Sequence, residues 1–169
     1  MSTLHSISQL IDRISRLLGH SVSYMTLALV LMQISLVVMS AVFNTGSIMM
    51  QESLLYFHSM IFLGGASYTL LQDAHVRVDV FYSRMSPQAK QWVNIIGCLV
   101  FLMPVCGIIG YYAWDFVMDS WDIREGSIES SGLQIVYILK SMIVFFVFTV
   151  LLQSISEIIK SILTLKQSS

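Results

Sequence analysis

Long apolar stretches alternate with short polar ones along the chain, and this pattern predicts four membrane-spanning helices. The stretches cover about residues 22–43, 53–71, 92–114 and 133–155. Each is long enough to cross a hydrocarbon core of about 30 Å, which takes about 20 helical residues. They contain no Asp, Glu, Lys or Arg apart from Lys140 in the fourth stretch. Because backbone groups within lipid must be satisfied internally, we expect all four to be helices.

Helical periodicity also marks both ends of the chain. Residues 5–19 place apolar and polar side chains on opposite faces of a helix, which we expect to end at Gly19. Such a helix is typical of a membrane surface, with Arg13 and Arg16 among the lipid headgroups. The tail around Lys160 repeats the pattern. Packing of either helix on a protein partner instead of lipid is the alternative.

The positive charges predict the orientation of the chain. Seven of the eight Lys and Arg residues outside the spans lie in the N-terminal segment, the 73–91 loop and the tail, whereas the 115–131 loop has only Arg124. Cytoplasmic loops retain Lys and Arg. We therefore expect both termini and the 73–91 loop in the cytoplasm, and the 115–131 loop on the periplasmic side.

Composition agrees with a membrane protein. The chain is 56% hydrophobic and 11% charged, whereas a soluble domain usually has about 25% charged residues. We therefore predict an all-α membrane protein with a single four-helix domain over residues 1–169. Nothing in the composition favours nucleic-acid binding.

The 115–131 loop is acidic. Its first three carboxylates are spaced i, i+4, i+7, so a helical extension of the third span would place them on one face. A solvated face, a calcium site and a docking patch for a basic partner are all compatible with this spacing. The acidic residues are Asp115, Asp119, Asp122, Glu125 and Glu129.

The sequence gives little support for an enzyme active site or a cofactor site. Cys98 and Cys106 are eight residues apart on one helix, about 12 Å along its axis, which is too far for a disulfide. A b-haem anchor would need two histidines within the spans, and only His58 lies in one. We predict neither an enzyme nor a cofactor. A self-contained four-helix carrier or channel, and a membrane anchor for a redox enzyme, remain the alternatives.

Three polar residues within or beside the spans are candidates for pairing. Lys140 lies about 12 Å from the outer end of its helix, and Glu52 precedes the second span on the same side. His58 lies about 9 Å deeper than Glu52. Our first hypothesis is a Glu52–Lys140 pair, because intramembrane charges usually find partners. Alternatively, Lys140 extends to the interface and Glu52 is solvated.

The third span is predicted to be long. Ser86 and Pro87 suit the N-cap and the first position of its helix. From Pro87 to about Asp119 the helix would measure about 50 Å. Pro104 cannot donate to the Val100 carbonyl and should kink it. Three nearby glycines would allow close helix approach: Gly97, Gly107 and Gly110.

Residues 71–85, LQDAHVRVDVFYSRM, join the second and third spans and alternate apolar with polar residues. A lone strand would leave its edges unpaired, so we interpret the alternation as a boundary between lipid and headgroups. In such a boundary, His75, Arg77 and Asp79 are hydrated while the valines between them face lipid or protein.

These residues resemble a known family, the small membrane subunit (DctQ-like) of tripartite ATP-independent periplasmic (TRAP) transporters. The resemblance rests on Glu52 at the start of the second span, Gly64 to Ala66 within it, and the pair His75 and Asp79 after it. The later stretch SWDIREGSIESSGLQIVYILK is also similar to that family.

The resemblance implies a subunit of the bacterial inner membrane that works with a large multi-span permease subunit and a periplasmic substrate-binding protein. The large subunit would take up an organic acid with sodium, and this chain would enlarge its static scaffold. The acidic residues become candidate contacts for the binding protein. Candidates for structural or intersubunit pairing are Glu52, His58, His75, Arg77, Asp79 and Lys140.

Overall fold

A computed structural model describes residues 2–72 and 85–167, and all of its regular elements are helices. The first two spans correspond to α1 (Ser2–Phe43) and α2 (Ile48–Leu71). The third is a continuous helix of three segments, which are α4 (Pro87–Ile96), the π-helix η1 (Gly97–Leu102) and α5 (Met103–Asp122). The fourth corresponds to α6 (Val136–Gln167). Among the described residues, four helices are long and apolar enough to cross a membrane, so the predicted fold class is confirmed to this extent.

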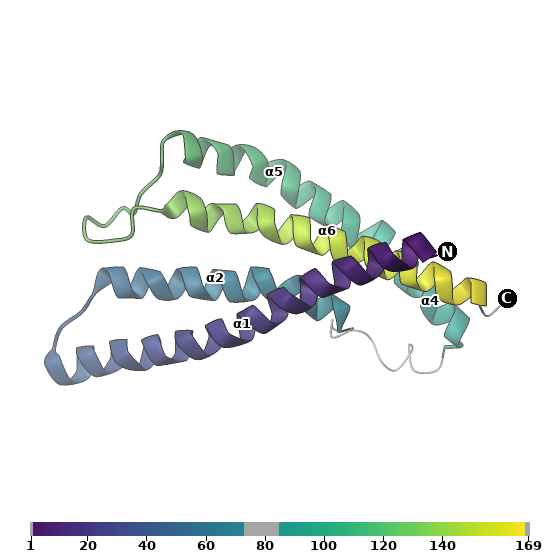
Figure 1. The fold of residues 1–169 in the computed structure, drawn as a ribbon. Helices are drawn as coiled ribbons and strands as arrows, with labels where there is room; N and C mark the ends of the chain where they lie inside the picture. The colour runs from purple at the N-terminus through teal and green to yellow at the C-terminus, as the bar shows by residue number, and fades with distance from the viewer. Residues whose placement is uncertain (1, 73–84, 168–169) are drawn as a thin grey trace.

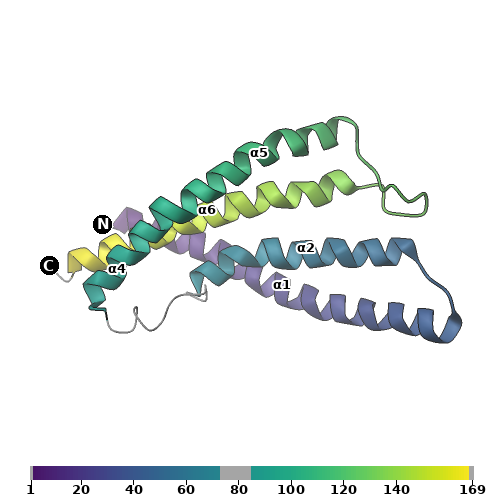
Figure 2. The same ribbon diagram turned by 180° about the vertical axis from the view of Figure 1, so that it is seen from behind.

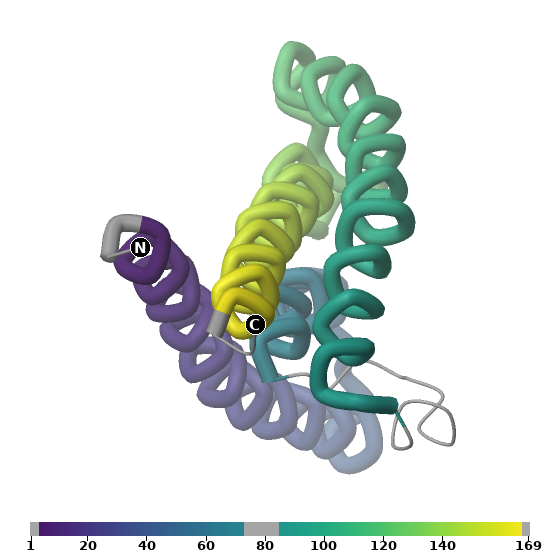
Figure 3. Tube along the Cα trace, turned by 90° about the vertical axis from the view of Figure 1, so that its right-hand side faces the viewer, coloured from purple at the N-terminus to yellow at the C-terminus, as the bar shows by residue number. Residues whose placement is uncertain are grey.

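The helices form two antiparallel pairs that meet on α6. Both termini lie at one end, which we call the terminal end, and the loops 44–47 and 123–135 lie at the opposite loop end (Figure 1). α1 and α5 diverge towards the loop end, as the view from behind also shows (Figure 2). Seen from the terminal end, α6 lies between α1 and the α4–α5 helix (Figure 3). α6 is therefore the central helix.

Side chains are distributed as in a protein whose solvent is lipid. The largest fully buried side chains are small or polar: Gln153, Cys106, Ser67, Ser120, Ser154 and Ser156. A small apolar cluster of Leu70, Cys106, Val147 and Val150 lies where α2, α5 and α6 meet. Among the large apolar side chains that the structure describes, many more are exposed than buried. Small residues inside allow helices to approach closely when no hydrophobic effect drives them together.

α1 is a single helix of 42 residues, about 63 Å long. The prediction that a first helix ends at Gly19 is wrong, because α1 continues through this residue. Gly19 instead lies under the ring of Tyr68 on α2, and a Cβ atom at this position would lie 2.3 Å from the ring. Gly19 thus permits a close crossing of α1 and α2.

The third span begins as predicted. The Ser86 side chain accepts a hydrogen bond from the Ala89 N–H, and Pro87 occupies the first turn of α4. The predicted end near Asp119 is three residues short of the observed end at Asp122. Before Pro104 the helix widens into η1, where the Met103 N–H donates to the Cys98 carbonyl, five residues back. The missing proline donor is therefore accommodated by a π turn.

The three glycines of this helix differ in their surroundings. Gly110 allows close approach as predicted, since a Cβ atom there would lie 3.1 Å from Val147 on α6. Gly97 and Gly107 have nothing within 4 Å of such an atom. For these two the prediction of close approach within the chain is wrong.

The short loop 44–47 positions Glu52. Asn44 adopts a left-handed conformation with φ of 50°, and the Thr45 N–H donates to the Met39 carbonyl at 3.3 Å, which ends α1. Ser47 then caps α2 by accepting a hydrogen bond from the Met50 N–H. α2 therefore begins five residues before the predicted start of the span, and Glu52 lies inside its first turns.

Candidate functional site

Glu52 joins α2 to the loop between α5 and α6. One carboxylate oxygen, Oε1, accepts a hydrogen bond from the Ser127 hydroxyl. The other, Oε2, accepts from the Leu133 N–H at 2.6 Å. Gly132 packs directly on this carboxylate, since a Cβ atom there would lie 2.6 Å from both oxygens. A single side chain of α2 therefore organises the residues that lead into α6.

Lys140 forms an ion pair with Glu125 of the same loop and lies 4.0 Å from the centroid of the Phe116 ring. The predicted Glu52–Lys140 pair is wrong, because the loop supplies each residue with a different partner. The hydrogen bond from Lys140 lowers the pKa of Glu125 below its ordinary value of 4.5. We call the contacts of Glu52, Lys140 and Glu125 the loop cluster.

The other acidic residues of this end lie apart from the loop cluster. Asp115, Asp119 and Asp122 are on α5, so the predicted helical extension is confirmed. All three side chains are exposed, as is Glu129 in the loop. Glu125 differs because its carboxylate is held by Lys140.

A second set of polar contacts joins α1 to α6 at the terminal end. Asp12 Oδ1 accepts hydrogen bonds from the Ser156 hydroxyl at 2.7 Å and from Gln153 Nε2 at 3.0 Å. Lys160 Nζ lies 3.3 Å from Asp12 Oδ2 and also pairs with Glu157. Asp12 therefore serves three donors on α6 at once.

Two serines extend these contacts along α1. The Ser8 and Ser156 hydroxyls lie 2.8 Å apart, and the Ser15 hydroxyl donates to Gln153 Oε1 at 2.7 Å. We call the contacts between Ser8, Asp12 and Ser15 of α1 and their partners on α6 the terminal cluster. Both Gln153 and Ser156 are fully buried in it.

The sequence did not predict the terminal cluster, because its pattern placed the polar face of residues 5–19 at the membrane surface. In the structure part of that face packs on α6, while Arg13 and Arg16 are exposed. The signal that would have identified it is the recurrence of small or polar residues at intervals of four, three and four: Ser8, Asp12, Ser15 and Gly19. Whether this segment also contacts a membrane surface stays a prediction.

Of the remaining candidates, His58 takes no part in either cluster. His58 is exposed, and its ring centroid lies 4.7 Å from that of Phe62. His75, Arg77 and Asp79 lie outside the described residues. Cys98 and Cys106 are both buried. Among the residues that the structure describes, no group of three or more His, Cys, Asp or Glu side chains is arranged to hold a metal ion.

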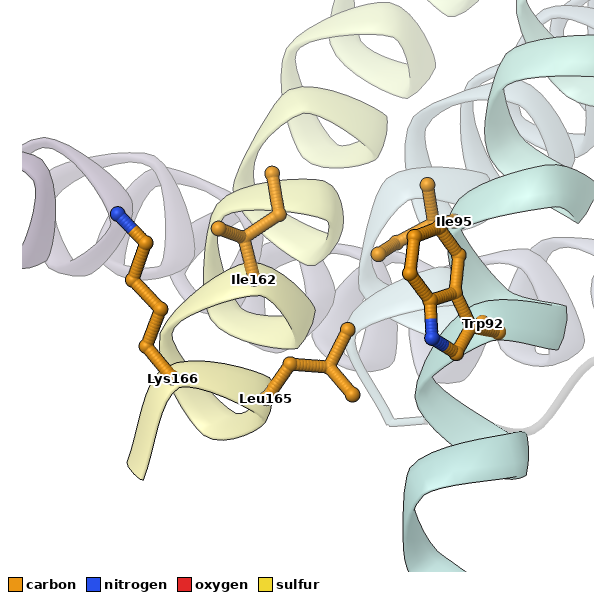
Figure 4. A pocket seen from close by; sticks show the side chains of 5 residues that line it. All are labelled: Trp92, Ile95, Ile162, Leu165 and Lys166. Atoms are coloured by element: carbon orange, nitrogen blue, oxygen red, sulfur yellow. The ribbon is translucent and has the colours of Figure 1, made fainter. Parts of the chain in front are cut away.

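A hollow of about 350 Å³ lies between α4 and α6 near the terminal end. Its walls are Trp92, Ile95, Ile162 and Leu165, together with the stem of Lys166 (Figure 4). The Lys166 side chain extends away from the Trp92 ring. Such walls suit hydrocarbon and offer little for recognising a polar solute.

Four helices able to cross a bilayer, with outward-facing apolar side chains and polar contacts at both ends, define an all-helical integral membrane protein. A family described as tripartite ATP-independent periplasmic transporters, DctQ component, matches residues 27–164. The chain belongs to this family and is thus the small component of a TRAP transporter. Comparisons with curated proteins and with solved structures give no match. The family match includes the loop cluster, but it begins after the α1 residues of the terminal cluster.

Proposed function

We propose that the chain is an accessory permease subunit that acts as a scaffold for a large, elevator-type subunit of the same transporter. In this proposal a periplasmic binding protein delivers an organic acid, and the large subunit takes it up together with sodium. Membership of the DctQ family supports the association with both partners. The sodium coupling and the substrate class rest on the family resemblance.

The observation that carries the scaffold role is the attachment of α6 at both of its ends. The terminal cluster joins α6 to α1, and the loop cluster joins the residues just before α6 to α2. Discrete contacts at both ends resist sliding of one helix past another. A bundle held in this way can remain still while a partner's mobile domain moves against it.

The proposed location is the bacterial inner membrane, with both termini in the cytoplasm. The distribution of Lys and Arg supports this orientation, and both termini lie at the same end of the bundle (Figure 1). In this orientation the exposed Arg13 and Arg16 meet cytoplasmic headgroups. His75, Arg77 and Asp79 belong to the proposed cytoplasmic boundary.

The loop end then faces the periplasm and the binding protein. Asp115, Asp119 and Asp122 are exposed there and form the proposed docking patch. Replacing all three by Asn should slow uptake most at low ionic strength, because screening weakens long-range attraction. An uptake rate that is unchanged at every salt concentration would contradict this contact.

The scaffold role is tested by purification and reconstitution. The tagged chain, extracted gently from its native membrane, should retain a larger multi-span membrane protein. Liposomes containing both proteins, supplied with the binding protein and a sodium gradient, should accumulate an organic acid. Liposomes containing this chain alone should accumulate none.

Two results would decide against the proposal. Sodium-driven uptake by the chain alone would establish a self-contained carrier. A haem spectrum in the purified complex would instead favour a membrane anchor of a redox enzyme.

A further inference from the structure

A groove runs along the contact between α1 and α2 and contains polar side chains about halfway along the predicted spans. At the centre of the groove an open hollow of about 400 Å³ is lined by Gln33 of α1 and by Gln51 and His58 of α2, among leucines. Gln33 lies about 15 Å from the loop 44–47, and so does His58. Both are therefore at the same depth and reach the same hollow.

The side chains of Gln33 and His58 make no hydrogen bond within the part of the chain that the structure describes. Both side chains are exposed. Lipid chains offer no hydrogen bonds, so an amide and an imidazole at this depth are unfavourable unless another protein group faces them. Gln and His side chains commonly make hydrogen bonds between helices in membranes.

The opposite side of the bundle has the properties of a lipid-facing surface. Trp92 and Trp114 are both exposed there, 22 residues apart, about 33 Å along the helix. This spacing matches a hydrocarbon core of about 30 Å flanked by aromatic belts. Residues 95–110 between them contain no Asn, Gln, His, Ser or Thr. Val100 and Phe101 are among the exposed side chains of this stretch.

The α1–α2 groove thus suits a protein neighbour, whereas the α4–α5 surface suits lipid. We infer that the α1–α2 groove, centred on Gln33 and His58, is where a transmembrane helix of the large permease subunit docks, and that this helix carries a hydrogen-bonding side chain at mid-membrane depth. The α4–α5 surface meets lipid. This inference rests on the proposed function and adds to it the surface that is used.

Photocrosslinking in native membranes tests the assignment of the surface. A photoreactive residue at Leu55, which lines the groove and is 54% exposed, is compared with one at Val100, which is 58% exposed. We expect an adduct with the large subunit from position 55 and only lipid adducts from position 100. Large-subunit adducts from position 100 and none from position 55 would overturn the inference. An adduct from position 55 of twice the chain's own mass, indicating a second copy, would also overturn it, as would lipid adducts alone.

The role of the two polar side chains is tested with Gln33→Leu and His58→Leu. Each should reduce recovery of the complex about threefold or more, since one interhelical hydrogen bond is lost. The isolated variants should unfold at the same temperature as the unaltered chain or higher, because Leu suits the bilayer better than Gln or His. Loss of the complex therefore cannot be attributed to misfolding. Val105→Leu on the α4–α5 surface is the matched control, and its complex should be recovered in full.

The outcomes separate this inference from the proposed function. If the unaltered chain copurifies with the large subunit but Gln33→Leu and His58→Leu bind it equally well, the docking surface is wrong and the scaffold role stands. If the unaltered chain retains no large subunit, both are wrong.

Discussion

The terminal cluster and the loop cluster lie at opposite ends of the same central helix and differ in their access to water. In the terminal cluster two helices face each other, and Gln153 is 0% exposed. In the loop cluster Glu52 of α2 binds the irregular loop 123–135. The side chains of Lys140 and Glu125 there remain 19% and 32% exposed. A buried donor that loses its acceptor has no water to replace it. The terminal cluster should therefore determine stability, whereas the loop cluster should respond to solution conditions.

The largest effect is expected from Asp12→Ala. The change removes the acceptor that Ser156, Gln153 and Lys160 share. We expect the free energy of unfolding to fall by about 3 kcal/mol, since three hydrogen bonds to a charged acceptor are lost where water has little access. Thermal unfolding of the purified protein in detergent micelles measures the change.

The matched control for Asp12 is Arg13→Ala, one residue further along α1. Arg13 is exposed, so its removal should change the free energy of unfolding by no more than about 0.5 kcal/mol. Equal unfolding temperatures for the two variants would show that the terminal cluster does not hold α1 on α6.

The next largest effect concerns the crossing of α1 and α2 beside the terminal cluster. In Gly19→Ala the added methyl group meets the ring of Tyr68, and the resulting overpacking should destabilise the protein by about 2 kcal/mol. Gly107→Ala adds the same atom where nothing lies within 4 Å. That variant should be unchanged or slightly more stable, because Ala favours a helix more than Gly. Equal shifts of the unfolding temperature in the two variants would contradict the close crossing.

At the loop end, Glu52→Ala should act mainly on the loop. It removes the acceptor for the Leu133 N–H and for the Ser127 hydroxyl, and partial access to water should limit the loss to about 1.5 kcal/mol. Faster hydrogen exchange confined to residues 123–135 is the expected signature. Glu129→Ala, an exposed neighbour in the same loop, is the control. A uniform loss of protection over all the helices would mean that the loop cluster also determines global stability.

The smallest effect is a pH dependence of the same loop. Lys140 lowers the pKa of Glu125 in the folded protein, so this ion pair stabilises the loop above the unfolded-state pKa. The stabilisation is lost as the pH falls through the lower, folded-state value. Hydrogen exchange of residues 123–135 should therefore lose protection as the pH falls below 4.5, the ordinary pKa of glutamate. Lys140→Met should abolish this loss of protection in acid. An identical acid response in the variant would show that the Lys140–Glu125 pair is not its cause.

The spans could be predicted from the sequence because the thickness of a bilayer and the periodicity of a helix constrain them strongly. The start of α4 at Ser86 and Pro87 was predictable for a similar reason, since both residues act locally. Gly19 shows the limit of such reasoning. A glycine after an amphipathic stretch suits either a helix end or a close crossing, and only the position of Tyr68 decides between them.

The partners of the polar residues were less predictable. Opposite charges on the same side of the membrane suggested Lys140 for Glu52, but the conformation of residues 123–135 brings Glu125 to Lys140 and Ser127 to Glu52. Loop conformation is not contained in hydrophobic periodicity. The central place of α6 was also hidden, because a helix that is apolar on most sides does not reveal which neighbours surround it.

The terminal cluster has a consequence for the order of events during biosynthesis. Asp12 leaves the ribosome before its partner Lys160, which is made 148 residues later. At 5–20 residues per second, α1 waits roughly 7–30 s for the helix that neutralises its aspartate. A nascent chain that stops before Gln153 cannot form the terminal cluster. Truncated products should therefore remain accessible to quality-control proteases.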